Sequence, residues 1–259
     1  MREFLYGHWA VLESLRAGRR EADQLLLSEG IDERSKSVAE IISVCEQRQI
    51  PVKRVQRRIL DDIARGGNHQ GTALRVGEYP YVDYLAMIEK ATERREKPFF
   101  LLLDLLKDPQ NVGSLIRVAD AVGVHGVILQ DRRGVGVTPS VVNASSGAVE
   151  HLQVAQVTNL VNTMKDLKKH DIWLVGLELG EDVPPLSNST LDMALGLVVG
   201  SEGEGMRRLV RETCDMLVML PMRGHVGSLN AATAGAVALY SAWQARQWEG
   251  WQGARQGGR

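Results

Sequence analysis

The stretch MRGHVGSLNAATAGAVALY, residues 222–240, joins a glycine-rich loop to a helix made of small residues. It follows an apolar strand, MLVMLP. Ser228 and Asn230 can each cap the helix, because their side-chain oxygens accept hydrogen bonds from its first free N–H groups. The run AATAGA, residues 231–236, leaves almost no side-chain volume on the helix, although Gly235 costs helix stability. We therefore expect another part of the chain to lie unusually close to this helix.

A second glycine-rich loop, in the segment LGLVVGSEGEGM (residues 195–206), follows another apolar strand and carries acids in place of lysine. It lacks the Lys-Ser/Thr pair of a phosphate-binding Walker A loop and the G-x-G-x-x-G spacing of a dinucleotide-binding fold. Glu202 and Glu204 would repel a polyphosphate and suit a ligand with positive charge or free hydroxyls. Alternatively, the segment is a plain strand-to-helix turn whose acids favour the N-terminus of the next helix. The missing glycine spacing disfavours a nucleotide-dependent oxidoreductase.

The segment DPQNVGSLIRVADAVG, residues 108–123, predicts an amphipathic helix after the apolar strand FFLLLDLL. Its apolar stripe consists of Val112, Leu115, Ile116, Ala119 and Val122. Asn111, Ser114 and Arg117 lie along one edge of that stripe. In one interpretation Asn111 caps the helix and Arg117 is a solvated charge. In the other, Arg117 reaches over the strand end toward an anionic ligand, because ligands of open α/β sheets bind beyond the carboxyl ends of the strands.

Alternating helices and strands divide the chain of 259 residues into two α/β regions. Residues 1–77 hold several short elements and predict a small α/β sandwich. Residues 78–97 begin with a turn, continue as a charged helix and predict a linker. Residues 98–259 repeat βα units, and their nearly continuous apolar strands predict a mostly parallel sheet covered on both faces. A long helix over residues 228–248 and a frayed tail are expected at the end of this region.

The composition is that of an ordinary soluble globular protein, with a formal net charge of −1. Bulk charge therefore does not indicate a nucleic-acid binder. Cys45 and Cys214 lie in apolar stretches and are expected to be core residues rather than a disulfide, which suits a reducing compartment. The six histidines show no ligand spacing, so no metal is expected. Without a signal peptide or an apolar run near the ~18 residues of a membrane span, the expected location is cytoplasmic, with no membrane partner.

One local cluster of basic residues stands out in this nearly neutral chain. The segment VKRVQRRILDDIARGGNHQG, residues 52–71, contains Lys53, Arg54, Arg57, Arg58 and Arg65. Asp61 and Asp62 are the only acids within the segment. The cluster indicates RNA binding through phosphate contacts, although a solvated charged face would have the same composition. A low salt slope in RNA binding would argue against many phosphate contacts.

Taken in order, NVGSLIR, VVGSEGEGM and LPMRGHVGSLNAATA resemble the three motifs of the SpoU (TrmH-like) branch of the SPOUT RNA methyltransferases. The resemblance covers residues 98–246. Residues 1–77, through LYGHWAVLESLRAG and HQGTALRV, resemble the small L30e-like RNA-binding domain attached to many members. This layout is similar to the RlmB type, which methylates a guanosine ribose in the peptidyl-transferase loop of large-subunit (23S) ribosomal RNA.

The resemblance implies a SPOUT α/β-knot domain over residues 98–259, in which the C-terminal segment threads a loop to form a deep trefoil knot. This overrides the general rule that chains avoid knots, and the threaded loops would pack against the small residues at 231–236. It also implies that S-adenosylmethionine (SAM) is the cofactor, whose sulfonium suits acidic loops without lysine. The implied cofactor-binding residues are Leu177, Gly200, Glu202, Gly203, Leu220, Met222, Ser228 and Leu229.

The implied reaction is transfer of a methyl group to a ribose 2′-hydroxyl. The residues that match catalytic or near-catalytic positions are Asn111, Arg117, Glu202, Ser228 and Asn230. Arginine is effectively always protonated, so our hypothesis is that Arg117 binds the adjacent phosphate and lowers the pKa of the hydroxyl, rather than acting as the base. Ser228 and Asn230 would orient substrate or cofactor. The complete set disfavours a catalytically silent RNA-binding protein of the same fold.

The resemblance further implies a homodimer whose site is completed across the interface. Contacts are expected from the terminal helix, through Leu239, Tyr240, Trp243 and Trp248, although these residues can equally pack within one subunit. Ribosomal RNA is the expected substrate because of the extra N-terminal domain, and transfer RNA is the main alternative.

Overall fold

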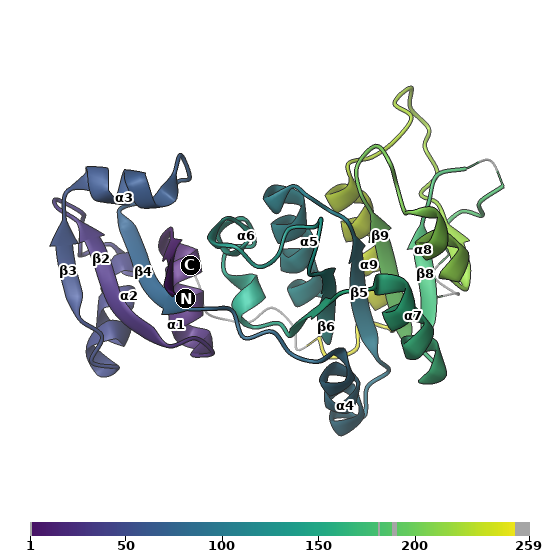
Figure 1. Cartoon of the computed structure of the whole chain (residues 1–259), viewed down its shortest axis with the longest axis horizontal. Coiled ribbons are helices and arrows are strands. Elements are labelled where there is room, and N and C mark those ends of the chain that lie inside the picture. Colours follow the sequence, from purple (N-terminus) through teal and green to yellow (C-terminus); the bar gives the residue numbers. More distant parts are fainter. Residues whose placement is uncertain (1, 181, 188–190, 252–259) are drawn as a thin grey trace.

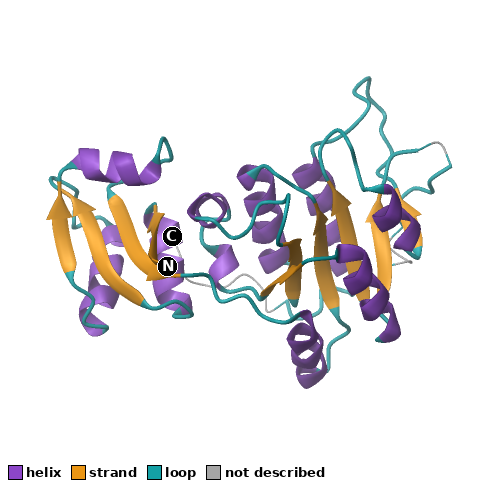
Figure 2. Ribbon diagram, viewed as in Figure 1, coloured by secondary structure: helices purple, strands orange, loops and turns teal. Residues whose placement is uncertain are grey.

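The computed structural model describes residues 2–180, 182–187 and 191–251, and it contains two sheets (Figure 1). Residues 252–259, which make up most of the expected tail, lie outside the described residues. Figure 2 shows helices packed along both sheets, as predicted for an α/β chain. Nowhere in the described ranges is there a helix long and apolar enough to cross a membrane.

The first sheet has the strand order β1-β4-β2-β3. Its strands are β1 (Arg2–Tyr6), β2 (Ala22–Ser28), β3 (Val52–Val55) and β4 (Thr72–Gly77), with β2 and β3 parallel and the other pairs antiparallel. The accompanying helices are α1 (His8–Ala17), α2 (Lys36–Gln47) and α3 (Arg57–Ala64). The sequence prediction omitted β1 and α3, although the buried residues of α3, Leu60 and Ala64, have the spacing of one helical turn.

The second sheet is fully parallel, with the strand order β10-β8-β9-β5-β6-β7. Its strands are β5 (Phe99–Asp104), β6 (Gly126–Gln130), β7 (Val154–Val157), β8 (Trp173–Leu177), β9 (Leu195–Gly200) and β10 (Met216–Val218). Leu101 and Leu103 of β5 share a buried cluster with residues of α5 (Pro109–Ala121) and α9 (Ala231–Ala245). Phe100 and Leu102 share another with residues of α4 (Tyr84–Arg94), α7 (Leu160–Lys169) and α8 (Arg208–Thr213). The predicted parallel sheet, covered on both faces, is therefore confirmed.

The residue that caps helix α5 lies three positions before Asn111, the cap that one interpretation of the sequence predicted. The cap is Asp108, whose side chain accepts a hydrogen bond from the Gln110 N–H at 3.1 Å, and Pro109 occupies the first helical position. The interpretation of Asn111 as the cap is therefore wrong. Asn111 lies in the first turn, where its side chain is available for other contacts.

Helix α9 begins after Asn230, whose side chain accepts hydrogen bonds from two backbone N–H groups of the first turn. The expected start at Ser228 is wrong, because Ser228 lies in the preceding loop. The predicted close neighbour is confirmed at Gly235, where a Cβ atom would lie 2.4 Å from Leu115 Cδ2 and 3.4 Å from Val199 Cγ2. That neighbour is helix α5 together with β9, so the small residues are explained by helix packing. The trefoil knot stays a prediction.

A hydrophobic core continues from the first sheet into the second. Strand β1 and helix α1 contact α6 (Pro139–Ala144) and a short 3-10 helix, Ala148–Glu150 (Figure 1). Leu12 on one side and Val149 on the other belong to the same cluster of buried side chains. The two regions are therefore docked against each other through apolar side chains.

The segment between the two regions also packs on the second sheet. Helix α4 places Met87 so close to β6 that a Cβ atom on Gly126 would lie 2.2 Å from the Met87 sulfur. Cys45 is buried and Cys214 half-buried, and both are free thiols. We retain residues 1–77, 78–97 and 98–259 as the proposed division of the chain.

We expect the buried His125 to make the stability of the fold depend on pH. Its Nδ1 accepts a hydrogen bond from the Phe99 N–H at 3.1 Å, so a neutral ring carries its hydrogen on Nε2, which lies 2.9 Å from Glu96 Oε2. Burial is the largest influence and lowers the pKa of His125 below its ordinary 6.5, with smaller contributions from Arg94 and Arg246, while Glu96 opposes the shift.

We expect the free energy of unfolding to fall as the pH drops below about 6.5, because the unfolded chain then binds a proton at His125 that the folded chain resists. The loss can reach about 1.4 kcal/mol per pH unit for this one group. Urea unfolding at several pH values, for the natural chain and for His125→Asn, measures it. An equally steep pH dependence in His125→Asn would contradict the assignment.

Candidate functional site

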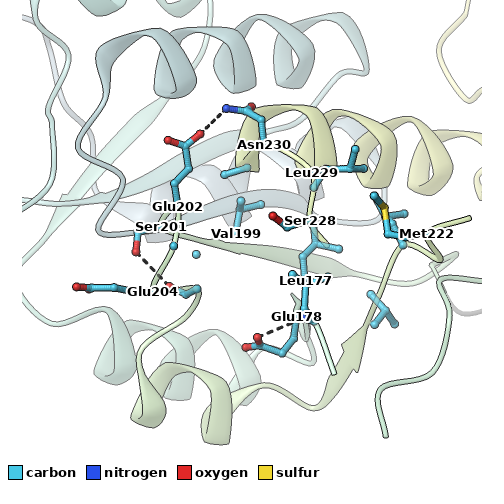
Figure 3. A pocket seen from close by; sticks show the side chains of 18 residues that line it. Leu177, Glu178, Val199, Ser201, Glu202, Glu204, Met222, Ser228, Leu229 and Asn230 are labelled. Atoms are coloured by element: carbon cyan, nitrogen blue, oxygen red, sulfur yellow. Dashed lines mark hydrogen bonds between the residues drawn. The ribbon is translucent and has the colours of Figure 1, made fainter. Parts of the chain in front are cut away.

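A cavity of about 520 Å³ opens beyond the carboxyl ends of β8, β9 and β10 (Figure 3). Four chain segments line it: the end of β8, the loop that follows β9, the end of β10 with the residues after it, and the start of α9. Its volume is typical of a site for a small organic ligand. Its location is the one at which open α/β sheets bind ligands, so the strands themselves create the site.

The lining of this cavity is apolar and acidic. Leu177, Val199 and Leu220 supply apolar wall, and no lysine or arginine is among the residues that line it. Glu178 lies 3.7 Å from Arg211 as an ion pair, whereas Glu202 and Glu204 have no basic partner in the ion pairs of the described chain. The cavity therefore suits a ligand that combines an apolar or aromatic part with positive charge, and it does not suit a polyphosphate.

The glycines of the acidic loop are required by its shape. A Cβ atom on Gly200 would lie 2.3 Å from the carbonyl carbon of Gly205, so the loop folds back directly onto the end of β9. Ser201 and Gly205 exchange two backbone hydrogen bonds of 3.0 Å, and Gly203 adopts a φ of +81° that side chains rarely tolerate. These constraints hold the loop against the strand end, with Glu202 at the cavity wall.

Two residues that the sequence did not single out anchor the far end of the loop. Asp104, fully buried at the end of β5, accepts hydrogen bonds of 2.8 Å from both the backbone N–H and the side-chain Nε of Arg207. Arg207 also donates to Gln130 Oε1 at 2.9 Å. The sequence offered one signal for this pair: Asp104 ends an otherwise apolar strand, and a buried carboxylate requires a partner.

The structure brings three of the five proposed catalytic residues together at the edge of the cavity. Asn111 Nδ2 donates to Glu202 Oε1 at 2.7 Å, and Asn230 Nδ2 donates to Asn111 Oδ1 at 3.0 Å. Asn230 also donates to Glu202, as Figure 3 shows. Asn230 Oδ1 accepts hydrogen bonds from the backbone N–H groups of Ala232 and Thr233 at 2.9 and 3.1 Å, which fixes the direction in which its side-chain amide donates.

The other two proposed catalytic residues lie apart from this cluster. Ser228 lines the cavity from the loop before α9. Arg117 is exposed on α5, about 9 Å further along the helix axis than Asn111, and its Nη1 donates to Ser146 Oγ at 3.1 Å. Arg117 does not line the cavity. Within one chain, Arg117 is therefore separate from the cluster of Asn111, Glu202 and Asn230.

All eight residues proposed to bind a cofactor line the cavity: Leu177, Gly200, Glu202, Gly203, Leu220, Met222, Ser228 and Leu229. They come from segments up to 52 positions apart in the sequence, since 229 − 177 = 52. In the described part of the chain, no group of three or more His, Cys, Asp or Glu side chains is placed to hold a metal ion.

The five proposed RNA-binding residues are all exposed on the first region. Lys53 and Arg54 lie on the edge strand β3, Arg57 and Arg58 begin α3, and Arg65 follows the end of α3. Arg54 forms an ion pair with Glu33 at 2.7 Å, so part of its charge is neutralised within the chain.

The terminal helix makes aromatic contacts within its own chain. Trp243 lies edge-on to Trp248 and to Tyr240, with ring centroids 4.9 and 5.9 Å apart, and Leu239 is buried. Tyr240 and Trp248 nevertheless remain 44% and 40% exposed, so they are the members of this group that offer surface to a second subunit.

Comparison with known proteins identifies two families along the chain. Residues 98–240 match the model of the SpoU rRNA methylase family, and residues 4–82 match the model described as RNA 2′-O ribose methyltransferase substrate binding. A TrmH family tRNA/rRNA methyltransferase of Bacillus subtilis (strain 168) is 40% identical over 246 residues, which covers 94% of this chain and 96% of that protein. One from Staphylococcus haemolyticus is 37% identical over 93% of this chain and 95% of its own length.

Solved structures share the fold. The SpoU methyltransferase AviRb from Streptomyces viridochromogenes, crystallised in complex with the cofactor AdoMet, superimposes with a TM-score of 0.74. It is 26% identical in sequence, and the match covers 95% of this chain and 90% of that one. The similarity therefore includes both regions rather than the second sheet alone.

Proposed function

The chain belongs to the SpoU rRNA methylase family, and from that premise we propose that it methylates the ribose 2′-hydroxyl of a guanosine in large-subunit (23S) ribosomal RNA. The enzyme class is an S-adenosylmethionine-dependent RNA ribose methyltransferase. The assignment of S-adenosylmethionine as the cofactor is supported by the acidic, lysine-free cavity at the strand ends. The RNA part is supported by the family of residues 4–82, the substrate-binding region.

The residues of the cavity fit S-adenosylmethionine. Its adenosine requires apolar wall and backbone hydrogen bonds, which Leu177, Leu220 and Leu229 and the adjoining loops offer. Its sulfonium is favoured by nearby carboxylates, and Glu202 and Glu204 supply them. When bound, this cofactor supplies an electrophilic methyl group.

The chain contributes positioning and electrostatics to the reaction. We assign Asn111 and Asn230 the role of holding Glu202 in one orientation at the cavity edge, because both donate to the same carboxylate oxygen. Ser228 lines the same cavity and can orient substrate or cofactor. The 2′-oxygen must approach in line with the bond that breaks, so such fixed groups contribute by restricting geometry.

We propose that Arg117 acts on the RNA rather than on the cofactor. Its guanidinium stays protonated, binds the phosphate next to the target ribose and favours loss of the hydroxyl proton as the new O–CH₃ bond forms. Since Arg117 lies outside the cavity of its own chain, we further propose a homodimer in which Arg117 of one subunit completes the site of the other.

Transfer RNA is the alternative substrate, because relatives are named for both tRNA and rRNA. The substrate-binding region favours ribosomal RNA. Mapping 2′-O-methyl sites in RNA from a deletion strain, with and without the gene restored, distinguishes the two. We expect one guanosine of 23S ribosomal RNA to lose its methyl group in the deletion strain; loss from a transfer RNA instead would contradict the proposal.

Asn230→Asp separates the two contacts of this residue. The aspartate keeps the acceptor that caps α9, but it loses the donor to Glu202 and places a second carboxylate beside it, so we expect methyl transfer to fall about ten- to a hundredfold. Asn230→Ala removes both contacts and should also cost about 1 kcal/mol of unfolding free energy. Kinetics and urea unfolding of the two variants measure this. Full activity in Asn230→Asp would exclude a role for the Glu202 contact.

A further inference from the structure

A second cavity, of about 960 Å³, lies between the two regions of the chain. The first region lines it with α3, the loop after α3 (residues 65–68) and the end of β1. The second region lines it with Gln110 at the start of α5 and with residues of α6. We call this cavity the interdomain groove. It is larger than the cofactor cavity, and neither the proposed catalytic residues nor the proposed cofactor ligands line it.

The walls of the interdomain groove are fixed relative to each other. Asn143 of α6 donates to the Tyr6 carbonyl oxygen at 2.8 Å, and Tyr6 and Ser140 share a hydroxyl hydrogen bond of 3.3 Å. A Cβ atom on Gly67 would lie 2.6 Å from the Tyr6 ring, so the loop after α3 packs directly on this residue. The groove is therefore a preformed feature.

The chemistry of the groove suits unpaired RNA. Ile59 is 45% exposed and, with the half-buried Phe4 and Ile63, offers apolar surface to a base. Unpaired bases are recognised by stacking and by hydrogen bonds to their edges, and the exposed amides of Asn68 and Gln110 can supply the latter.

The charged residues that line the groove are Arg65 and Asp62, so its attraction for a phosphate backbone depends on Arg65 together with the neighbouring arginines of α3. Arg65 lines the groove and is exposed. Arg58 lies one helical turn before Asp62, which also lines it, so Arg58 and Asp62 share a face of α3. No ion pair of the described chain occupies Arg57, Arg58 or Arg65, in contrast to Arg54 with its Glu33 partner. Their charge is available to phosphates.

The groove and the proposed active site are linked through the start of α5. Gln110 lines the groove, and the next residue, Asn111, donates to Glu202 at the cofactor cavity. A strand that reaches Gln110 in the groove therefore lies one residue of α5 away from the side chain that contacts Glu202. We propose that the interdomain groove binds a single-stranded segment of the RNA substrate next to the target ribose, and so contributes to the choice of the methylated nucleotide. This inference rests on the proposed function.

Ile59→Glu tests the proposal, with Leu85→Glu as its matched control. Both residues are partly exposed, 45% and 39%, and both lie in the first turn of a helix, where an added glutamate is tolerated. Leu85 lies on α4, outside the groove. The probe is a labelled single-stranded RNA of about ten nucleotides, a length at which stacking and phosphate contacts both operate, compared with the same RNA annealed to its complement.

We expect the natural chain to bind the single strand about tenfold more tightly than the duplex. Ile59→Glu should weaken single-strand binding about tenfold, while Leu85→Glu changes it less than about twofold and both variants bind S-adenosylmethionine normally. Crosslinks from a 4-thiouridine-labelled strand should map to residues 59–68 or 139–143.

Three results would overturn the inference: no binding of the single strand by the natural chain, equal binding of strand and duplex, or equal effects of the two substitutions. The readout is binding, so it is independent of methyl transfer. If the natural chain binds the single strand as expected but methylates no RNA, the proposed function fails and the groove assignment stands.

Discussion

Replacing Arg117 with alanine is expected to lower methyl transfer by about 10²–10³-fold while leaving the affinity for S-adenosylmethionine unchanged. The two effects separate because Arg117 does not line the cofactor cavity and is bonded instead to Ser146. Arg117→Lys keeps the charge but loses the bidentate geometry, so it should retain measurable activity. Single-turnover kinetics and calorimetric titration of the cofactor measure both quantities. Equal loss in the two variants would contradict a purely electrostatic role.

The same residue gives a test of the proposed dimer. In an equimolar mixture of Arg117→Ala and Asn230→Ala subunits that exchange freely, half of the dimers are mixed, and each mixed dimer holds one intact site if Arg117 acts across the interface. We expect such a mixture to recover about a quarter of the natural activity, because the two sites of a symmetric dimer are equivalent. No recovery, in a sample shown by ultracentrifugation to be dimeric and exchanging subunits, would place Arg117 in the site of its own chain.

Replacing Arg20 with alanine is expected to lower the free energy of unfolding by about 3–5 kcal/mol. The side chains of Arg20 and Glu150 are both fully buried and lie 2.9 Å apart, at the contact between the two regions. Arg20 also pairs with Glu3 and lies 4.9 Å over the ring of Tyr79. Alanine would leave the Glu150 carboxylate buried without its partner.

The stability of the Arg20→Ala variant is expected to fall as the pH rises. Burial already raises the pKa of Glu150 against the opposing effect of Arg20, so loss of Arg20 raises it further. The folded variant then binds a proton that the unfolded chain releases near pH 4.5, and its stability falls as the pH rises above that value. Urea unfolding should therefore show a larger deficit at pH 7 than at pH 5.

The double variant Arg20→Met/Glu150→Leu is the control for this interpretation. It removes both charges and keeps apolar volume, so its stability should lie within about 1–2 kcal/mol of the natural chain. A deficit as large as that of Arg20→Ala would instead assign the effect to lost packing around Tyr79.

The sequence allowed the parallel sheet and the acidic, glycine-rich loop after β9 to be predicted because their determinants are local. A continuous apolar strand indicates that both faces of the sheet are buried. Glycines and acids just after β9 indicate a loop at the strand end that suits a positively charged ligand. The close contact at Gly235 was predicted from residue size alone.

Other features depend on contacts between distant positions and could not be read from a pattern. The pairing of Asp104 with Arg207 joins residues 103 positions apart, and Arg20 meets Glu150 across the two regions. The Asn111 cap was predicted wrongly because Asp108 competes for the same role three residues earlier. The interdomain groove exists only because the two regions are docked.

The most direct test of the central claim is the fate of tritium from methyl-labelled S-adenosylmethionine after incubation of the enzyme with unmethylated ribosomal RNA. A methylated 2′-oxygen cannot attack the neighbouring phosphate, so ribose methylation leaves the label in dinucleotides that resist alkaline hydrolysis. We predict tritium in those dinucleotides, and about 10²–10³-fold less of it in the same time with Arg117→Ala. Label released in mononucleotides, or no transfer to RNA at all, would contradict the assignment of this chain as a ribose 2′-O-methyltransferase.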